Sequence, residues 1–188
     1  MVVDLQCYEG RNLDTVTQAE SLASYGEPIA RDYESWTAAN AMLETCDRLT
    51  EEGEPAVQQF VLLAGALSSL AGGTHEAGLV LDSYLLRAMA IAGWAASFHD
   101  CARCGAEGPH RAFDVASGGA VCPVCRPPGS AAPAPQTFEL MAALLTGDWQ
   151  VADDSEVWHR KEASRLAQAH VHWHLERGVR SLRLVERV

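Results

Sequence analysis

The sequence lacks the features that direct a chain to or across a membrane. The N-terminus has no basic residues followed by a long apolar run, so no signal peptide is predicted. The most apolar stretch, residues 60–73, has roughly a dozen residues, whereas a bilayer span needs about 20. We therefore expect a cytoplasmic protein that does not contact membranes, in a compartment where cysteine thiols stay reduced.

Motifs of common catalytic sites are also missing. The glycine-containing stretches at residues 65–73 and 117–119 lack the lysine and the spacing of a phosphate-binding loop. No nucleophile stands beside a candidate base, and no paired carboxylates form a motif. We expect a protein that acts by binding and is not an enzyme.

Positive charge is scarce and unevenly distributed. The chain has 14 Lys and Arg against 25 Asp and Glu, a net charge of −11, which argues against DNA binding by the whole surface. Seven of those cations nevertheless lie between Arg160 and Arg187, where only three acids occur. This basic stretch is either a solvated helical face or a surface for a partner or nucleic acid.

The start of the chain predicts a β-hairpin. Val3, Leu5 and Cys7 alternate with polar residues, and a similar alternation resumes after a turn, giving a hairpin over residues 2–18. Two strands alone are marginally stable in water. The hairpin therefore either packs on the rest of the protein or is the remnant of a larger sheet.

The rest of the chain predicts a mainly α fold. From about Pro28 the apolar residues Ile29, Tyr33, Trp36, Ala39 and Leu43 recur at helical spacing, and this helix should end near residues 51–55. A proline-rich linker at residues 127–135 cannot be helical. Further helices are predicted over residues 55–71, 76–90, 136–145 and 155–177.

Four cysteines have the spacing of a zinc site. Cys101, Cys104, Cys122 and Cys125 form two CxxC pairs separated by seventeen residues. Each pair lets two thiolates converge from one tight turn, and a short hairpin between the pairs would bring the turns together. Four thiolates complete the tetrahedral coordination of zinc and leave no open position for catalysis. We predict one structural zinc ion in a zinc ribbon.

Other uses of these cysteines fit less well. A redox site needs a single CxxC in a βαβ context, and disulfides are disfavoured in the cytoplasm. A zinc deaminase needs HxE and PCxxC motifs, whereas His75 and Glu76 are adjacent and Val121 precedes the second pair. His110 could replace one cysteine as a ligand, although four thiols make this unnecessary.

A histidine pair on the last predicted helix is a second candidate site. His170 and His174 lie four residues apart, so they share one helical face and could hold a metal ion together. A rival hypothesis makes the protein an enzyme that uses this pair, with Glu176 nearby, as a catalytic metal site. No third ligand is evident, and an ordinary surface or half-buried pair is the other interpretation.

Four stretches carry a family resemblance: residues 2–20, 33–60, 78–105 and 173–187. Together they resemble the RecO family of bacterial recombination mediators, most closely its actinobacterial members. The resemblance covers essentially the whole chain, and the run leading into CARCG is its most specific part.

The resemblance implies an N-terminal OB-fold and a helical domain with an inserted four-cysteine zinc module. On this basis residues 1–24 are the last strand pair of an OB-fold. Residues 25–188 are the helical domain, with the zinc module at residues 99–128. Two strands cannot close a barrel, so most of the OB-fold is expected to be absent from this sequence.

The resemblance also implies a role in DNA repair and homologous recombination through the RecF pathway. Members of this family bind single-stranded DNA and its coating protein SSB, work with RecR to load RecA, and anneal complementary strands. They act in the cytoplasm, at the nucleoid. The family places much of its DNA and RecR binding on the OB-fold, so the alternative is an adaptor fragment that binds SSB without DNA.

Candidate binding residues follow from the chemistry of these partners. An SSB tail is acidic with an apolar end, so it needs an apolar groove rimmed by arginine. Arg177, Arg180 and Arg183 recur beyond Trp173 and would suit such a rim. The other interpretation is that Arg177 and Arg180 complement the C-terminal dipole of the last helix.

The zinc module carries three arginines of its own: Arg103, Arg111 and Arg126. Guanidinium groups bind phosphate oxygens well, so these side chains could contact DNA phosphates. They could equally be solvated loop residues.

Overall fold

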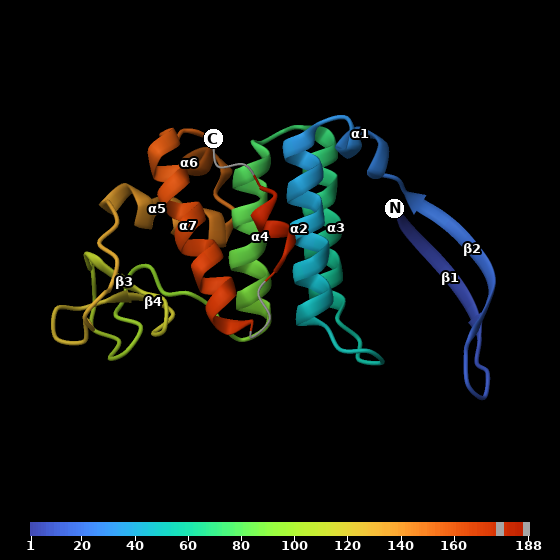
Figure 1. Cartoon of the computed structure of the whole chain (residues 1–188), viewed down its shortest axis with the longest axis horizontal. Coiled ribbons are helices and arrows are strands. Elements are labelled where there is room, and N and C mark those ends of the chain that lie inside the picture. Colours follow the sequence, from blue (N-terminus) through green and yellow to red (C-terminus); the bar gives the residue numbers. More distant parts are fainter. Residues whose placement is uncertain (176–178, 186–188) are drawn as a thin grey trace.

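The computed structural model describes residues 1–175 and 179–185, which are mainly helical, as the sequence predicts (Figure 1). The strands are β1 (Val2–Tyr8), β2 (Thr15–Ala23), β3 (Ala112–Asp114) and β4 (Gly119–Val121). The helices are α1 (Gly26–Ala30), α2 (Tyr33–Leu49), α3 (Val57–Gly72), α4 (Ala77–Ile91), α5 (Pro135–Thr146), α6 (Trp149–Asp153), α7 (Val157–His174) and the 3-10 helix η1 (Ser181–Arg183).

Helix α4 is the centre of the molecule. Its sequence is largely apolar and most of its residues are buried, as expected of a helix with neighbours all round. Figure 1 shows α2 and α3 on one side of it and α5 and α7 on the other. Leu81 and Leu85 belong to the first core, and Leu79 and Leu86 to the second. Each leucine is almost fully buried, and each such burial stabilises the fold by about 1.5–3 kcal/mol.

The helix predicted from about Pro28 is two helices. Asp32 has extended backbone angles, and its carboxylate accepts a hydrogen bond from the N–H of Ser35 at 2.8 Å, so α2 has its own N-cap. The apolar side chains Trp36 and Leu43 remain 42% and 48% exposed. In the described part of the chain, no helix is both long and apolar enough to cross a membrane.

The predicted hairpin is present and extends further than expected, because β2 runs to Ala23. The strands pair antiparallel, with irregular register at two points. Nearly every residue of both strands is exposed, including Leu5 and Leu22 (47% and 61%). Figure 1 shows the hairpin projecting away from the helices. The hairpin therefore does not pack on the helices, which was one of the two predicted alternatives.

The cysteine-bearing module lies at the opposite end of the molecule from the hairpin (Figure 1). It is inserted between α4 and α5, as predicted. Phe113 of β3 stacks on Phe98 and packs at a tilt against Phe138, with ring centroids 6.2 and 6.4 Å apart, which fixes the module to the second core. The proline-rich linker is not helical and pairs with β3 through Ala131, and Pro135 then opens α5.

Candidate metal centre and neighbouring surfaces

The four predicted cysteines meet at one point. Cys101 and Cys104 lie on the turn before β3, and Cys122 and Cys125 follow β4. All four sulfur atoms lie within 4.8 Å of one another. The antiparallel pairing of β3 with β4 brings the turns together, which confirms the predicted hairpin between them.

Backbone hydrogen bonds shape the two turns. The Gly105 N–H donates to the Cys101 carbonyl at 2.8 Å, and the Cys125 N–H donates to the Cys122 carbonyl at 3.1 Å. Gly105 has a φ of 70°, a conformation that glycine adopts without strain. The Cys122 N–H also points at the Cys101 sulfur at 3.4 Å, which links the two turns.

The sulfur cluster is electrostatically suited to a cation. The N–H of Cys122 lowers the pKa of Cys101 to about 6. In contrast, the Cys104 side chain, followed by that of Cys122, raises the pKa of Cys125 to about 12. Like charges this close disfavour one another, so the four thiols cannot all ionise unless a metal ion compensates them. The four residues therefore form a candidate metal site, with thiolates as its only protein ligands.

The arginines of the module are placed on its outside. Arg103, Arg111 and Arg126 are all exposed. The Arg103 guanidinium donates to the Cys125 carbonyl at 3.3 Å, so this side chain braces the second turn. Arg111 and Arg126 are exposed, which agrees both with a contact to phosphates and with a role as solvated loop residues.

The residues proposed to rim a groove near the C-terminus lie on separate elements. Trp173 lies on α7 and is 62% exposed. Arg180 and Arg183 are exposed at η1, which packs against α2. Arg177 lies outside the described residues.

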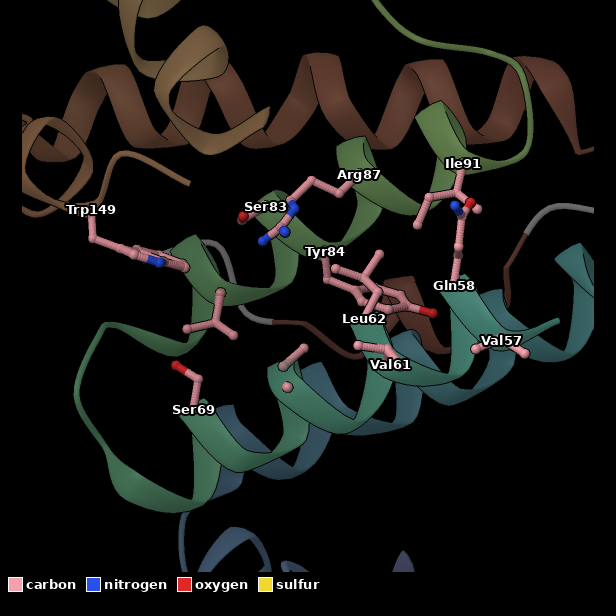
Figure 2. Close-up of a pocket in the computed structure, with 13 residues that line it drawn as sticks. Val57, Gln58, Val61, Leu62, Ser69, Ser83, Tyr84, Arg87, Ile91 and Trp149 are labelled. Atoms are coloured by element: carbon pink, nitrogen blue, oxygen red, sulfur yellow. The ribbon is translucent and has the colours of Figure 1, made fainter. Parts of the chain in front are cut away.

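An apolar groove lies elsewhere, between α3 and α4 (Figure 2). Its volume is about 660 Å³. Figure 2 shows Arg87 reaching along the groove toward Trp149. The apolar lining consists mainly of Val57, Val61, Leu62, Ala66, Val80, Tyr84 and Ile91.

The sequence patterns did not predict this groove, although the apolar composition of α3 was an indication of it. The helix is largely apolar, yet only Gln59 and Leu70 are buried. Val57 and Val61, which line the groove, are 67% and 61% exposed. An apolar helix with so little burial leaves a face for another molecule.

The histidine pair has a structural role. His170 is 1% exposed, and its Nε2 bonds the Trp94 carbonyl at 2.9 Å, which joins α7 to the start of the module. The His174 ring stacks on Trp94, with centroids 5.4 Å apart. Burial lowers the pKa of both histidines. In the described residues, only the four cysteines form a group of three or more potential metal ligands, and Glu176 lies outside them.

The fold and the site define a helical domain that carries a tetracysteine module. Comparisons with known proteins place it in a family. Residues 30–183 match the family model described as Recombination protein O C terminal. The chain belongs to the RecO family, as its sequence stretches predicted.

Several relatives support this assignment. A protein named DNA repair protein RecO from Nocardioides sp. is 56% identical over 189 residues, which cover 98% of this chain and 78% of the relative. The protein of that name from Streptomyces coelicolor is 56% identical over 179 residues, covering 95% and 72%. That from Thermobifida fusca is 52% identical over 186 residues, covering 98% and 76%. These organisms are actinobacteria, the group that the resemblance indicated.

Proposed function

We propose that this chain is a mediator of DNA repair and homologous recombination that acts by binding rather than by catalysis. Membership of the RecO family supports the repair role. On this proposal the protein works in the RecF pathway, at the nucleoid. It binds single-stranded DNA and SSB, acts with RecR to load RecA, and anneals complementary strands. The hairpin within residues 1–24 would be a strand pair of an OB-fold.

The α3–α4 groove carries the proposal for SSB. A tail that is acidic with an apolar end needs an apolar channel and a fixed cation. Apolar side chains line this groove, and Arg87 supplies a guanidinium group on its wall. In the described residues Arg87 forms no ion pair, so its charge is free for a carboxylate. We assign the tail to this groove, which does not include Arg180 and Arg183 at η1.

The metal centre is proposed to hold zinc in a structural role. Tetrahedral sets of four thiolates favour zinc or iron, and zinc does no redox chemistry. The proposed ligands are Cys101, Cys104, Cys122 and Cys125. They would use all four coordination positions, so the ion would stabilise the module and activate no water.

Binding of a labelled peptide tests the groove. The probe is a fluorescein-labelled peptide with several aspartates and a C-terminal phenylalanine, and fluorescence anisotropy gives its Kd. Arg87→Ala should weaken binding by about 10-fold or more, because a charge-assisted hydrogen bond contributes about 1.5–3 kcal/mol. Val61→Asp should weaken it further by placing a like charge in the groove.

Arg31→Ala is the matched control, since Arg31 is exposed at the end of α1, does not line the groove, and pairs with Glu27. Unchanged binding by both groove variants would contradict the groove assignment. A labelled single-stranded oligonucleotide, measured in parallel, separates the mediator from the adaptor. Tail binding without DNA binding would identify the adaptor.

A further inference from the structure

The exposed face of α7 has an unusual composition for an acidic protein. Residues 158, 161, 165, 169 and 172 follow helical spacing and share one side of the helix, with residue 173 at its edge. Apart from Ala169 they are aromatic or basic, and this α7 face consists of Trp158, Lys161, Arg165, His172 and Trp173. The opposite side of α7 packs into both cores.

Both tryptophans are about half exposed, and the ring of Trp158 also contacts that of His159, with centroids 4.0 Å apart. Trp158 is 51% exposed, and Trp173 is 62% exposed. They are 15 residues apart, which corresponds to about 22 Å along the helix. The two tryptophans lie at the ends of the α7 face, with the cations between them. They are not needed for packing, because Leu166 and Val171 on the other side of the helix already provide it.

Among the described residues, Lys161 and Arg165 of the α7 face have no ion-pair partner. Both side chains are exposed. Within α7, the acid that borders this face is Glu162. Its Oε2 accepts hydrogen bonds from the N–H of Ala134 at 3.0 Å and the hydroxyl of Thr137 at 2.5 Å, so its charge is turned toward α5. Arg160, by contrast, is paired with Glu76.

We propose that the α7 face binds single-stranded nucleic acid. Trp158 and Trp173 stack on bases, and Lys161 and Arg165 contact phosphates between them. Aromatic side chains combined with cations are the general chemistry by which proteins hold unpaired strands. The inference rests on the proposed function, in which the chain binds single-stranded DNA, and it assigns the binding of that DNA to a surface outside the hairpin and the zinc module.

Fluorescence anisotropy of a labelled oligothymidylate of about 16 nucleotides tests the proposal with the full chain. Trp158→Ala and Trp173→Ala should each weaken binding by about 5- to 150-fold, since a stacked base contributes about 1–3 kcal/mol. Both tryptophan variants should keep the salt dependence of the parent protein. Trp173→Phe should recover part of the loss.

The double variant Lys161→Ala/Arg165→Ala gives a different signature. Each phosphate contact adds about 0.7 to the slope of log K against log salt for a single strand. Removing both contacts should reduce that slope by about 1.4. A role of these side chains in folding alone would not change the salt slope.

Trp36→Ala and Arg31→Ala are the controls, because both residues are exposed on the α1–α2 side of the molecule. They should bind the oligonucleotide as the parent does. Circular dichroism and the Tm check that every variant folds. The parent should also bind a duplex of equal length less tightly, because its bases are not free to stack on tryptophan.

The outcomes separate this inference from the proposed function. If the parent binds the oligonucleotide and the α7 variants bind equally well, the α7 assignment is wrong and DNA binding lies on another surface. If the parent binds no oligonucleotide but binds the acidic peptide, both the α7 assignment and the DNA-binding part of the function are wrong. Loss of peptide binding in the α7 variants, with DNA binding intact, would also overturn the assignment.

Discussion

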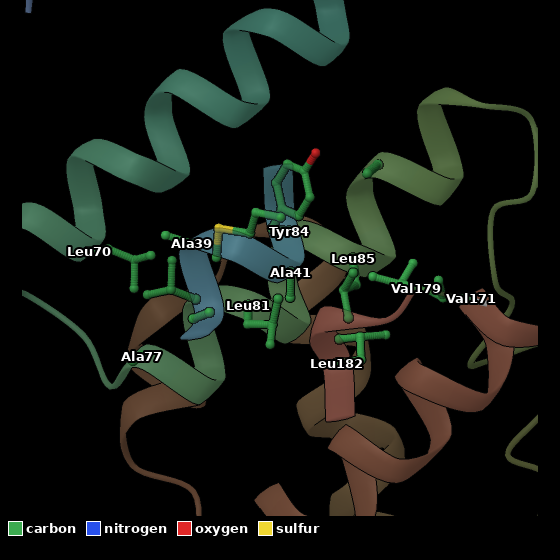
Figure 3. Packing of buried hydrophobic residues seen from close by; sticks show 14 of the residues in the cluster. Ala39, Ala41, Leu70, Ala77, Leu81, Tyr84, Leu85, Val171, Val179 and Leu182 are labelled. Atoms are coloured by element: carbon green, nitrogen blue, oxygen red, sulfur yellow. The ribbon is translucent and has the colours of Figure 1, made fainter. Parts of the chain in front are cut away.

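The Glu44 carboxylate on α2 is hydrogen-bonded to Ser181, which lies 137 residues further along the chain. The Oε2 atom of Glu44 accepts the Ser181 N–H at 2.8 Å and also the Ser181 hydroxyl. Its Oε1 atom accepts the N–H of Arg180 at 2.8 Å. The carboxylate thus caps the N-terminus of η1. Figure 3 shows Val179 and Leu182, which flank the capped residues in sequence, packed within the first core.

Stability at acidic pH should depend on Glu44. Burial opposes its ionisation, but the hydrogen bonds that it accepts, first that of the Ser181 side chain, outweigh burial and lower its pKa from 4.5 to about 2. Because the folded-state pKa lies below the unfolded value, the stabilisation is full above about 4.5 and is lost as the pH falls toward 2. Glu44→Gln should lower the free energy of unfolding at neutral pH by about 1–3 kcal/mol.

Urea denaturation of the parent and the variant across this pH range checks the prediction. The difference in the free energy of unfolding between the parent and the variant should shrink toward low pH. Comparing the two proteins separates the effect of Glu44 from that of the thiolates, which also take up protons at low pH. Glu27→Gln is the control, because the Glu27–Arg31 pair is exposed and such pairs stabilise little. A difference that stays constant with pH would contradict the role of the carboxylate charge.

The tetracysteine site should contain one zinc ion per chain. Blocking the thiols with a mercurial reagent should release that zinc, and a chromogenic chelator measures it. Cys122→Ser should weaken zinc binding by more than about 100-fold, because even indirect supports of a metal site contribute 10- to 100-fold. Cys46→Ser, outside the cluster, should retain the metal.

Loss of the metal should unfold the module and leave the α2–α3–α4 core intact, since that core contains no residue of the module. Far-UV circular dichroism of the chelated protein should therefore keep most of its helical signal. A preparation that keeps the module folded after rigorous chelation would contradict the structural role of zinc.

His170 should make the protein less stable below neutral pH. Burial lowers its pKa, so the folded state keeps the ring neutral while the unfolded chain takes up a proton below about 6.5. The contribution of neutral His170 to the free energy of unfolding is therefore full above about pH 6.5, and it is lost as the pH falls through the lower folded-state pKa. His170→Ala should cost about 1–3 kcal/mol, because the Trp94 carbonyl loses its donor.

His170→Gln is the matched variant, because the glutamine amide can still donate to the Trp94 carbonyl. It should keep much of the stability at about pH 7.5 and lose less than the parent at about pH 5.5. Thermal unfolding at both pH values measures this. An equal pH response in the parent and the variant would show that His170 does not titrate in this range.

Gly119 should be essential for docking of the module. It has a φ of 152°, and an added Cβ would overlap the carbonyl of Ser97, whose O accepts the Ala120 N–H at 2.7 Å. Gly119→Ala should cost about 1–3 kcal/mol or more and speed the loss of zinc to a competing chelator. Gly65→Ala is the control, since no atom lies within 4 Å of its added Cβ and alanine favours a helix. Equal rates of zinc loss in both variants would contradict the prediction.

Local patterns predicted the elements that depend on neighbours in sequence. The CxxC spacing identified all four cysteines of the cluster, because each pair converges within a single turn. Glycine and proline marked most helix ends, and Gly73 in a left-handed conformation does end α3. Apolar periodicity was less reliable on α2, where it selected Trp36 and Leu43. These side chains remain partly exposed, whereas Ala38 and Met42 are buried.

Short elements were missed because a few capping contacts determine them. Helix α6 follows an N-cap in which Asp148 accepts the Val151 N–H at 3.3 Å. Such a helix has too few residues for a periodic signal. Similarly, η1 depends on Glu44, a residue distant in sequence that no local window includes.

The sequence by itself determined the mainly helical class, the tetracysteine module and the family, because each is encoded by residues close together in the chain. Only the tertiary structure decided where surfaces form. The α3–α4 groove forms between two helices that are distant in sequence from its third wall at Trp149, and the α7 face is the side of that helix that points away from both cores. Which side is buried depends on contacts between distant elements, and periodicity alone does not specify it.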